Sequence, residues 1–139
     1  MTQFEYFNRV RMLAQEININ LQELAILRET AINDQFGGIG NGDDGNGNNG
    51  GGTPRSKVET AALKIVAFES LIAEKMRTLE MIKSEVAAVI EKISDPIDRI
   101  IMMRRYVLCR SWEEIIDVTG YSRSQVFRHH RKALKYAQI

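Results

Sequence analysis

Apolar residues recur every seven positions in two long stretches of this 139-residue chain, and no other feature constrains its fold as much. In residues 3–33 the recurring positions are Val10, Ile17, Leu24 and Ala31. Because seven residues make about two turns of an α-helix, these side chains share one face of a helix. Residues 3–33 therefore predict a single long amphipathic helix.

A second stretch, residues 54–94, carries the same repeat. Its recurring positions are Ile65, Ile72, Leu79, Val86 and Ile93. A helix with one apolar face is not stable alone in water, so we expect the two helices to pair as an antiparallel hairpin. A second apolar row in the first helix, at Met12, Ile19 and Ile26, lies on a different face and favours a homodimer through the long helices.

The segment between these helices, residues 34–53, contains nine of the ten glycines. Residues 40–45 match G-x-G-x-x-G, but a dinucleotide fingerprint follows a strand and opens a helix, and the sequence predicts no strand. A calcium loop requires glycine and glutamate where this chain has Asn49 and Arg55. We therefore predict a flexible linker that holds neither a cofactor nor a metal.

Charge is divided unevenly along the chain. Residues 1–94 carry 10 Lys and Arg against 13 Asp and Glu, whereas residues 95–139 carry 9 against 5. A basic C-terminal segment on an acidic body favours a polyanionic partner such as double-stranded DNA. Cys109 is the only cysteine, which excludes an internal disulfide and favours a cytoplasmic location. The sequence shows neither a signal-peptide pattern nor an apolar stretch of ~20 residues, so we expect no membrane contact.

Residues 95–139 predict three short helices from their start signals. Residues 95–96 are Asp-Pro, an N-cap followed by proline at the first helical position. Residues 111–114 and 122–125 each begin with Ser and end with Glu or Gln, which is the pattern of a capping box. Gly120 lies between the last two helices and can adopt the left-handed conformation that ends a helix. Two capped helices joined by such a turn have the layout of a helix-turn-helix.

Spacing within these two helices predicts which residues pack and which face outward. Ile116, Gly120 and Val126 have the spacing of a helix-turn-helix crossing, with further apolar contacts on its inner side. The predicted core is Ile115, Ile116, Gly120, Tyr121 and Val126. Outward-facing side chains of the second helix are expected to meet base edges and phosphates. The predicted DNA-binding residues are Ser122, Arg123, Ser124, Gln125, Phe127, Arg128, Arg131, Lys132 and Lys135.

The segment SWEEIIDVTGYSRSQVFRHHRKAL, residues 111–134, resembles region 4 of the sigma-70 family, whose helix-turn-helix recognises promoter elements. The longer segment DPIDRIIMMRRYVLCRSWEEIIDVTGYSRSQVFRHHRKAL is similar to small phage-encoded sigma-like regulators of the ArpU/RinA type. The match covers residues 54–137, and residues 1–33 only in pattern. Two positions depart from these relatives: Cys109 where a glycine or polar turn residue is frequent, and His129 where an apolar residue is usual.

This resemblance implies an all-α fold, in which a long N-terminal helical hairpin precedes a three-helix domain containing the helix-turn-helix. It also implies a sequence-specific transcriptional regulator of phage or prophage genes, working in the bacterial cytoplasm. Such a regulator acts at promoters alone or by contacting bacterial RNA polymerase.

Two other functions stay open from the sequence. Phage small terminase subunits also join a helix-turn-helix to long oligomerising helices, although usually in the reverse order, so a DNA-recognition and assembly protein is the main alternative. A protein that binds polymerase instead of DNA is the third. No nucleophile–base pair or carboxylate cluster is apparent, so we expect neither enzymatic activity nor a small-molecule ligand. His129 and His130 point about 100° apart on a helix, so they cannot share a metal and are expected to pack or to contact phosphate.

Overall fold

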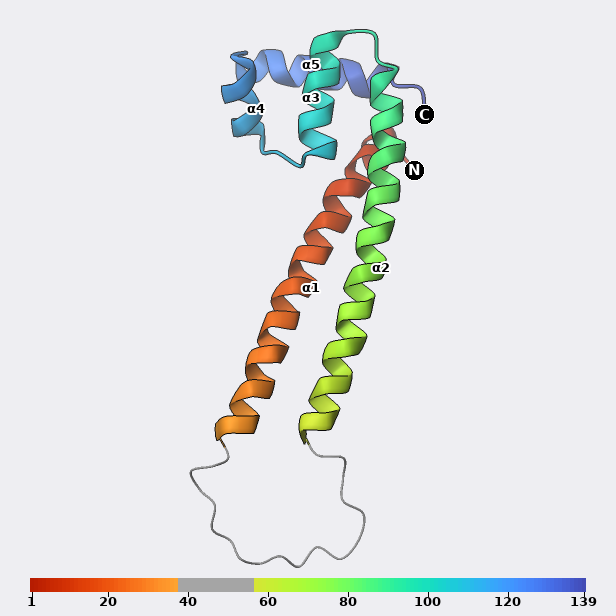
Figure 1. The fold of residues 1–139 in the computed structure, drawn as a ribbon. Helices are drawn as coiled ribbons and strands as arrows, with labels where there is room; N and C mark the ends of the chain where they lie inside the picture. The colour runs from red at the N-terminus through yellow and green to blue at the C-terminus, as the bar shows by residue number, and fades with distance from the viewer. Residues whose placement is uncertain (38–56) are drawn as a thin grey trace, which may run out of the picture. The chain divides into compact units, whose positions relative to one another are not determined.

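The computed structural model describes residues 1–37 and 57–139, and all regular structure within these ranges is helical, as the sequence predicts (Figure 1). The elements are α1 (Gln3–Gly37), α2 (Lys57–Glu91), α3 (Pro96–Met102), the π-helical turn η1 (Met103–Val107), α4 (Trp112–Thr119) and α5 (Arg123–Tyr136). None of these helices contains a stretch long and apolar enough to cross a lipid bilayer.

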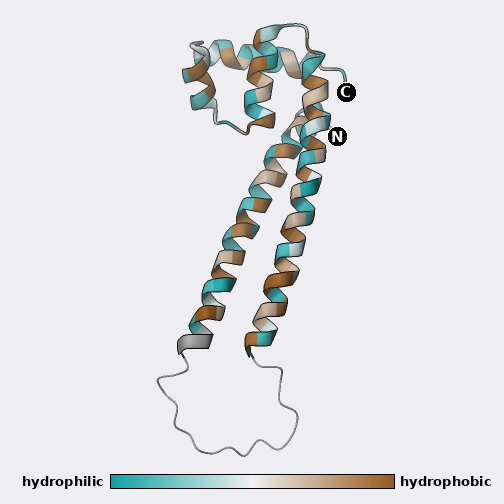
Figure 2. Cartoon of the chain, viewed as in Figure 1, coloured by the Kyte–Doolittle hydropathy of each residue, from teal (hydrophilic) through white to brown (hydrophobic). Residues whose placement is uncertain are grey.

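The two long helices pair in an antiparallel hairpin. Arg9 of α1 pairs with Glu85 of α2 at 2.7 Å, and Arg28 pairs with Glu69 at 2.6 Å, so positions rise along one helix as they fall along the other. Apolar positions alternate with polar ones along both long helices in Figure 2. The buried members of the apolar repeat are Val10, Ile17, Leu24, Ile72 and Val86, and Ile90 beside the repeat is buried as well. This burial is the physical reason that the repeats form long helices.

The bounds of the long helices differ from the prediction. Helix α1 continues to Gly37, so the first positions of the predicted linker 34–53 are helical, and the rest of that linker lies outside the described residues. The start of α2 predicted at residue 54 also lies outside them. At its other end α2 stops at Glu91 instead of residue 94. Pro96 disfavours a helical conformation at Asp95, the residue before it. Asp95 is indeed extended, with φ −78° and ψ 119°.

The chain forms two compact units, residues 1–16 with 76–139 (unit 1) and residues 17–75 (unit 2). Unit 1 has a continuous core to which α1, α2, α3, η1 and α5 all contribute. The buried residues of this core are Phe7, Val10, Val86, Ile90, Met102, Tyr106, Ala133 and Ala137. A second cluster in unit 1 joins α3, α4 and α5 through Ile101, Ile115 and Val126, which are all fully buried.

A row of aromatic rings runs through unit 1. Phe7 contacts Tyr106 at 5.7 Å between ring centroids, and Tyr106 stacks on His130 at 5.6 Å. Trp112 then meets His130 at 4.7 Å and Phe127 at 4.8 Å. Since α1, η1, α4 and α5 each supply a ring, the row fixes these four elements against one another.

Unit 2 has a much thinner core. Within its described residues, 17–37 and 57–75, the buried apolar side chains are Ile17, Leu24 and Ile72. Asn20 is also buried and accepts a hydrogen bond of 2.7 Å from the ammonium of Lys75. A polar pair at facing positions of an apolar seam fixes the register of two helices at some cost in stability.

Candidate nucleic-acid interface

The predicted helix-turn-helix is formed by α4 and α5. Helix α4 begins where Ser111 Oγ accepts from the Glu114 N–H at 3.2 Å. It ends at Gly120, whose φ of 72° is left-handed and whose N–H donates to the Ile116 carbonyl at 3.0 Å. A residue with a Cβ is strained at this φ, which explains why glycine occupies the turn.

Helix α5 begins with a complete capping box. Ser122 Oγ accepts from the Gln125 N–H at 3.2 Å, and the Ser122 N–H donates to Gln125 Oε1 at 2.9 Å. The box occupies the backbone N–H groups and the side-chain oxygens of both residues, which would otherwise be available to a ligand. Ser122 and Gln125, both predicted to contact DNA, are therefore used at least in part to start the helix.

The centre of the helix-turn-helix core is Ile115 and not Ile116. Ile115 is fully buried with Val126 and Ile101, whereas Ile116 and Tyr121 pack around this cluster and remain half-buried. The sequence spacing placed Ile116 at the crossing of the helices. In the structure Ile115 is the α4 residue buried with Ile101 of α3 and Val126 of α5, and Ile116 packs at the edge of this cluster.

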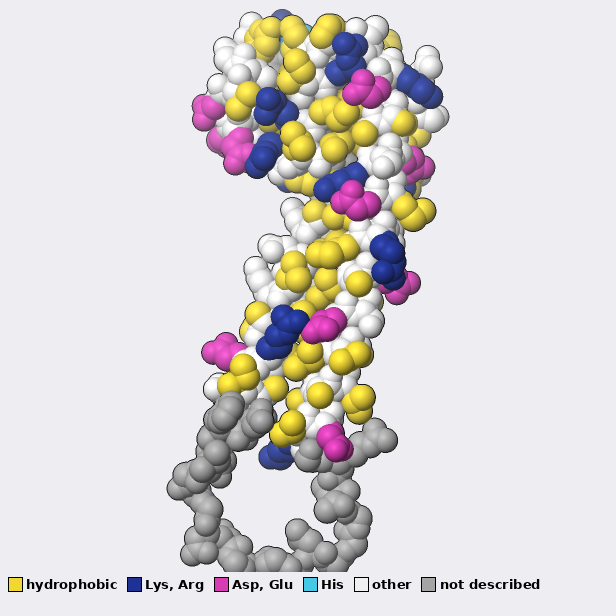
Figure 3. Space-filling view, in the orientation of Figure 1, with side chains coloured by type: hydrophobic (Ala, Val, Ile, Leu, Met, Phe, Trp, Pro, Cys, Tyr) yellow, Lys and Arg dark blue, Asp and Glu magenta, His cyan; other side chains and the backbone are white. Residues whose placement is uncertain are grey.

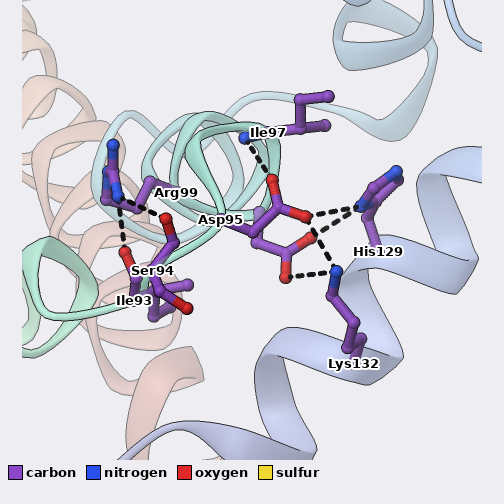
Figure 4. Close-up of polar contacts among 8 residues, drawn as sticks. Ile93, Ser94, Asp95, Ile97, Arg99, His129 and Lys132 are labelled. Atoms are coloured by element: carbon purple, nitrogen blue, oxygen red, sulfur yellow. Dashed lines mark hydrogen bonds and ion pairs between the residues drawn. The ribbon is translucent and has the colours of Figure 1, made fainter.

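Polar contacts join the start of α3 to the middle of α5 (Figure 4). His129 Nδ1 lies 2.6 Å from Oδ1 of the buried Asp98, and the Lys132 ammonium lies 2.8 Å from Asp95 Oδ2 and 3.4 Å from Asp98 Oδ2. The hydrogen bond from Lys132, followed by one from the Ile97 N–H, lowers the pKa of Asp95. These contacts fix the rotation of α5 and turn Lys132 towards α3.

Asp95, Asp98 and His129 are the one group of three potential metal ligands within the described ranges, their ligand atoms lying within 4.8 Å of one another. The sequence predicted no metal site. The Lys132 ammonium contacts both carboxylates, so a cationic group of the chain already neutralises them. A metal would have to displace this ammonium, which argues against a metal role.

His130 is held on the other side of α5. Its Nε2 lies 2.5 Å from the Tyr106 hydroxyl. Burial, followed by the charges of Arg105 and Arg131, lowers the pKa of His130 to about 4, and burial raises the pKa of Tyr106 to about 12. At neutral pH the phenol is therefore protonated and the imidazole neutral, and the two groups share one hydrogen bond. His129 and His130 both act in packing and not at the exposed face of α5.

The loop before α4 is closed by Arg105. Its guanidinium lies 4.4 Å from the centroid of the Trp112 ring and donates to the Arg110 carbonyl at 3.1 Å. Cys109 has a left-handed φ of 56°, a conformation that glycine adopts more readily than a residue with a Cβ. Before this loop the chain forms the π-helical turn η1, which closes with the Leu108 N–H on the Met103 carbonyl at 2.9 Å.

Two further residues predicted to contact DNA are engaged within the chain. Arg123 pairs with Glu113 of α4 at 3.1 Å, and its guanidinium lies 5.9 Å from the Phe127 ring. Phe127 was expected to point outward, but it is half-buried against Trp112. That expectation failed because the Trp112 ring extends from α4 over the first turns of α5.

The remaining predicted residues form one uncommitted row. Ser124, Arg128, Arg131 and Lys135 are separated by four, three and four positions, so they lie within an arc of ~60° along α5. All four are exposed, and in the described ranges their side chains make no hydrogen bond or ion pair, while the Lys135 ammonium lies 5.4 Å from the centroid of the Tyr136 ring. We call this row the α5 stripe. The α5 stripe presents three cations and a hydroxyl on α5, the second helix of the helix-turn-helix.

Comparisons of the chain with known protein families, curated proteins and solved structures find no match in any of the three.

Proposed function

We propose that this protein is a sequence-specific double-stranded DNA-binding regulator that reads DNA with the α5 stripe. The observation that carries the proposal is a capped helix-turn-helix whose second helix leaves Ser124, Arg128, Arg131 and Lys135 exposed and uncommitted. In helix-turn-helix proteins the second helix enters the major groove and its exposed side chains reach the bases.

The chemistry of the α5 stripe suits the major groove. Arginine donates two parallel hydrogen bonds to guanine O6 and N7, which makes Arg128 and Arg131 the principal candidates for base recognition. Ser124 is nearer the start of the helix and can donate to or accept from a base. Lys135 lies three turns further along, where a cation is expected to contact phosphate.

Arg123 has a different role in this proposal. Its pairing with Glu113 is exposed, and exposed pairs contribute little to stability, so a phosphate or guanine can compete for the guanidinium. Until that exchange occurs, Glu113 holds Arg123 beside the entrance of the helix. We therefore expect Arg123 to contribute less to discrimination between sequences than Arg128.

The regulatory role rests on the resemblance of residues 95–134 to sigma-70 region 4 and to phage regulators of the ArpU/RinA type. On this basis we propose control of phage or prophage genes in the bacterial cytoplasm, at promoters alone or together with RNA polymerase. The helix-turn-helix supports DNA recognition itself, and the regulated genes follow only from the resemblance.

Selection of bound duplexes from a random pool, followed by sequencing, tests the proposal. We expect an enriched motif that is bound with a dissociation constant rising steeply with salt, because bound phosphates release counterions. Enrichment of no motif, together with binding that does not change with salt, would contradict it. Capture of polymerase without any duplex would instead support the third function considered from the sequence.

A further inference from the structure

Unit 2 exposes more large apolar side chains than it buries. In its described residues three apolar side chains are buried, whereas eight large ones are at least 40% exposed. The exposed ones are Ile19, Leu21, Ile26, Ile32, Val58, Leu63, Val66 and Leu71. Figure 3 shows apolar side chains along both long helices on the face that it draws. Helices that are apolar on several sides are normally covered by other helices.

The exposed apolar area has the size of a stable interface. Eight side chains, each about half exposed, present roughly 700 Å² of apolar surface, spread over several faces of the two helices. For comparison, a standard interface buries ~800 Å² on each partner. Two helices with so thin a core are not expected to be stable alone. A partner that supplies apolar helical surface would therefore stabilise unit 2.

The net charge of unit 2 indicates which kind of partner fits it. The described residues of unit 2 carry four basic and six acidic side chains, so their net charge is only −2. A nucleic acid or a strongly charged protein gains little from such a surface. A second copy of the same near-neutral surface is not repelled, and it offers the same apolar side chains in return.

Unit 2 also carries both parts of a self-complementary surface. An open groove of about 470 Å³ lies between α1 and α2. Its apolar walls include Ile26, Leu27, Ala31 and Ala61. Projecting side chains such as Leu63 lie on the same unit, so one copy can insert them into the groove of another.

We propose that a second copy of this chain covers unit 2, and that the two hairpins complete a four-helix bundle. The seven-residue spacing of Ile19 and Ile26 on the uncovered face of α1 matches the spacing of knobs in such bundles. The Asn20–Lys75 hydrogen bond fixes the register of each hairpin before the two associate. This proposal does not depend on DNA binding.

Sedimentation equilibrium of the full chain over a wide range of micromolar concentrations tests the proposal. We expect a reversible dimer, and we expect Ile26→Glu and Leu63→Glu each to raise its dissociation constant by roughly 100-fold. The matched control is Val118→Glu on α4, because Val118 is 58% exposed and Ile26 is 62% exposed. The control variant should remain as dimeric as the wild type.

Circular dichroism separates loss of association from loss of folding. If Ile26→Glu loses helix, Ile26→Gln keeps a good helix former at the position and should still weaken the dimer. A monomeric wild type, or a dimer that both substitutions leave intact, would overturn the proposal. Assembly of eight or more subunits would also overturn it and would favour the assembly function considered from the sequence.

Discussion

Unit 1 and unit 2 use the same two long helices, but only unit 1 completes a core around its share of them. In unit 1 the α1 and α2 residues Phe7 and Val86 are fully buried with Tyr106 of η1. In unit 2 the same kind of repeat leaves Ile19 and Leu63 exposed. The difference teaches that an apolar repeat specifies a helix and its buried face, whereas the additional helices around it decide how much of its apolar surface is covered.

The largest effect on the free energy of unfolding is expected when equivalent side-chain truncations in the two units are compared. Ile115→Ala should lower the free energy of unfolding of unit 1 by about 3 kcal/mol, because the packed cluster around Ile115 cannot collapse into the cavity. Ile72→Ala should cost about 1–2 kcal/mol, since water or side-chain movement can fill its thinner surroundings in unit 2. Urea denaturation followed by circular dichroism measures both, with Trp112 fluorescence reporting on unit 1. Equal losses would contradict the contrast between the cores.

Acid should weaken unit 1 through a group that unit 2 lacks in its described residues. The pKa of His130 is about 4 when folded and 6.5 without these surroundings, so between these pH values the unfolded chain binds a proton that the folded chain does not. The stability contribution is complete above pH 6.5 and falls by roughly 1–3 kcal/mol as the pH approaches 4.

Thermal melts followed by Trp112 fluorescence between these pH values check this expectation. His130→Phe keeps an aromatic ring against Tyr106 and Trp112 but removes the titrating group, so its stability should vary less with pH over this window. At lower pH the lowered pKa of Asp95 adds a separate loss, which the variant should retain. An unchanged pH dependence in the variant would assign the effect to another group.

The third test replaces the polar pair of unit 2, and we expect the replacement to raise stability. Replacing both partners by Asn20→Leu and Lys75→Leu should raise the free energy of unfolding by about 1–2 kcal/mol, because apolar contacts replace a buried polar pair. Lys75→Leu alone should be less favourable, since it leaves the buried Asn20 amide without this donor. Thermal denaturation of both variants shows whether the Asn20–Lys75 pair lowers the stability of unit 2 while it fixes the register of the two helices.

The smallest effect concerns the turn between α4 and α5. Gly120→Ala should cost about 1 kcal/mol, because the left-handed φ of 72° disfavours a Cβ. An added Cβ would meet no atom within 4 Å, so conformational strain alone sets this cost. Val118→Ala on the exposed side of α4 is a matched control and should change stability by less. A loss of several kcal/mol at Gly120 would indicate packing that the turn does not show.

Sequence periodicity and start signals were sufficient to predict the helices. The heptads predicted α1 and α2, and the Ser122 capping box predicted the start of α5, because both depend on residues a few positions apart. The π-helical turn was not predicted, because its bond from Leu108 to Met103 has no local residue signature.

The candidate site was harder to predict because its side chains are committed by distant partners. Asp98 lies in the first turn of α3, and nothing near it in the sequence indicates that it meets His129 across 31 positions. Lys132 and Phe127 have the composition of a DNA-binding face, but α3 and α4 turn them into internal contacts. Helical periodicity alone groups them with Arg128, and only packing separates them.

The central claim is that the α5 stripe reads DNA, and fluorescence anisotropy with the selected duplex and a scrambled duplex tests it most directly. Arg128→Ala should weaken specific binding by ~5–100-fold and binding to the scrambled duplex much less. The matched control, Arg77→Ala, removes an equally charged exposed side chain from α2 and should change specific binding by less than about 2-fold. Equal losses on both duplexes for Arg128→Ala, or equal losses for the two variants, would contradict the assignment of the α5 stripe as the reading surface.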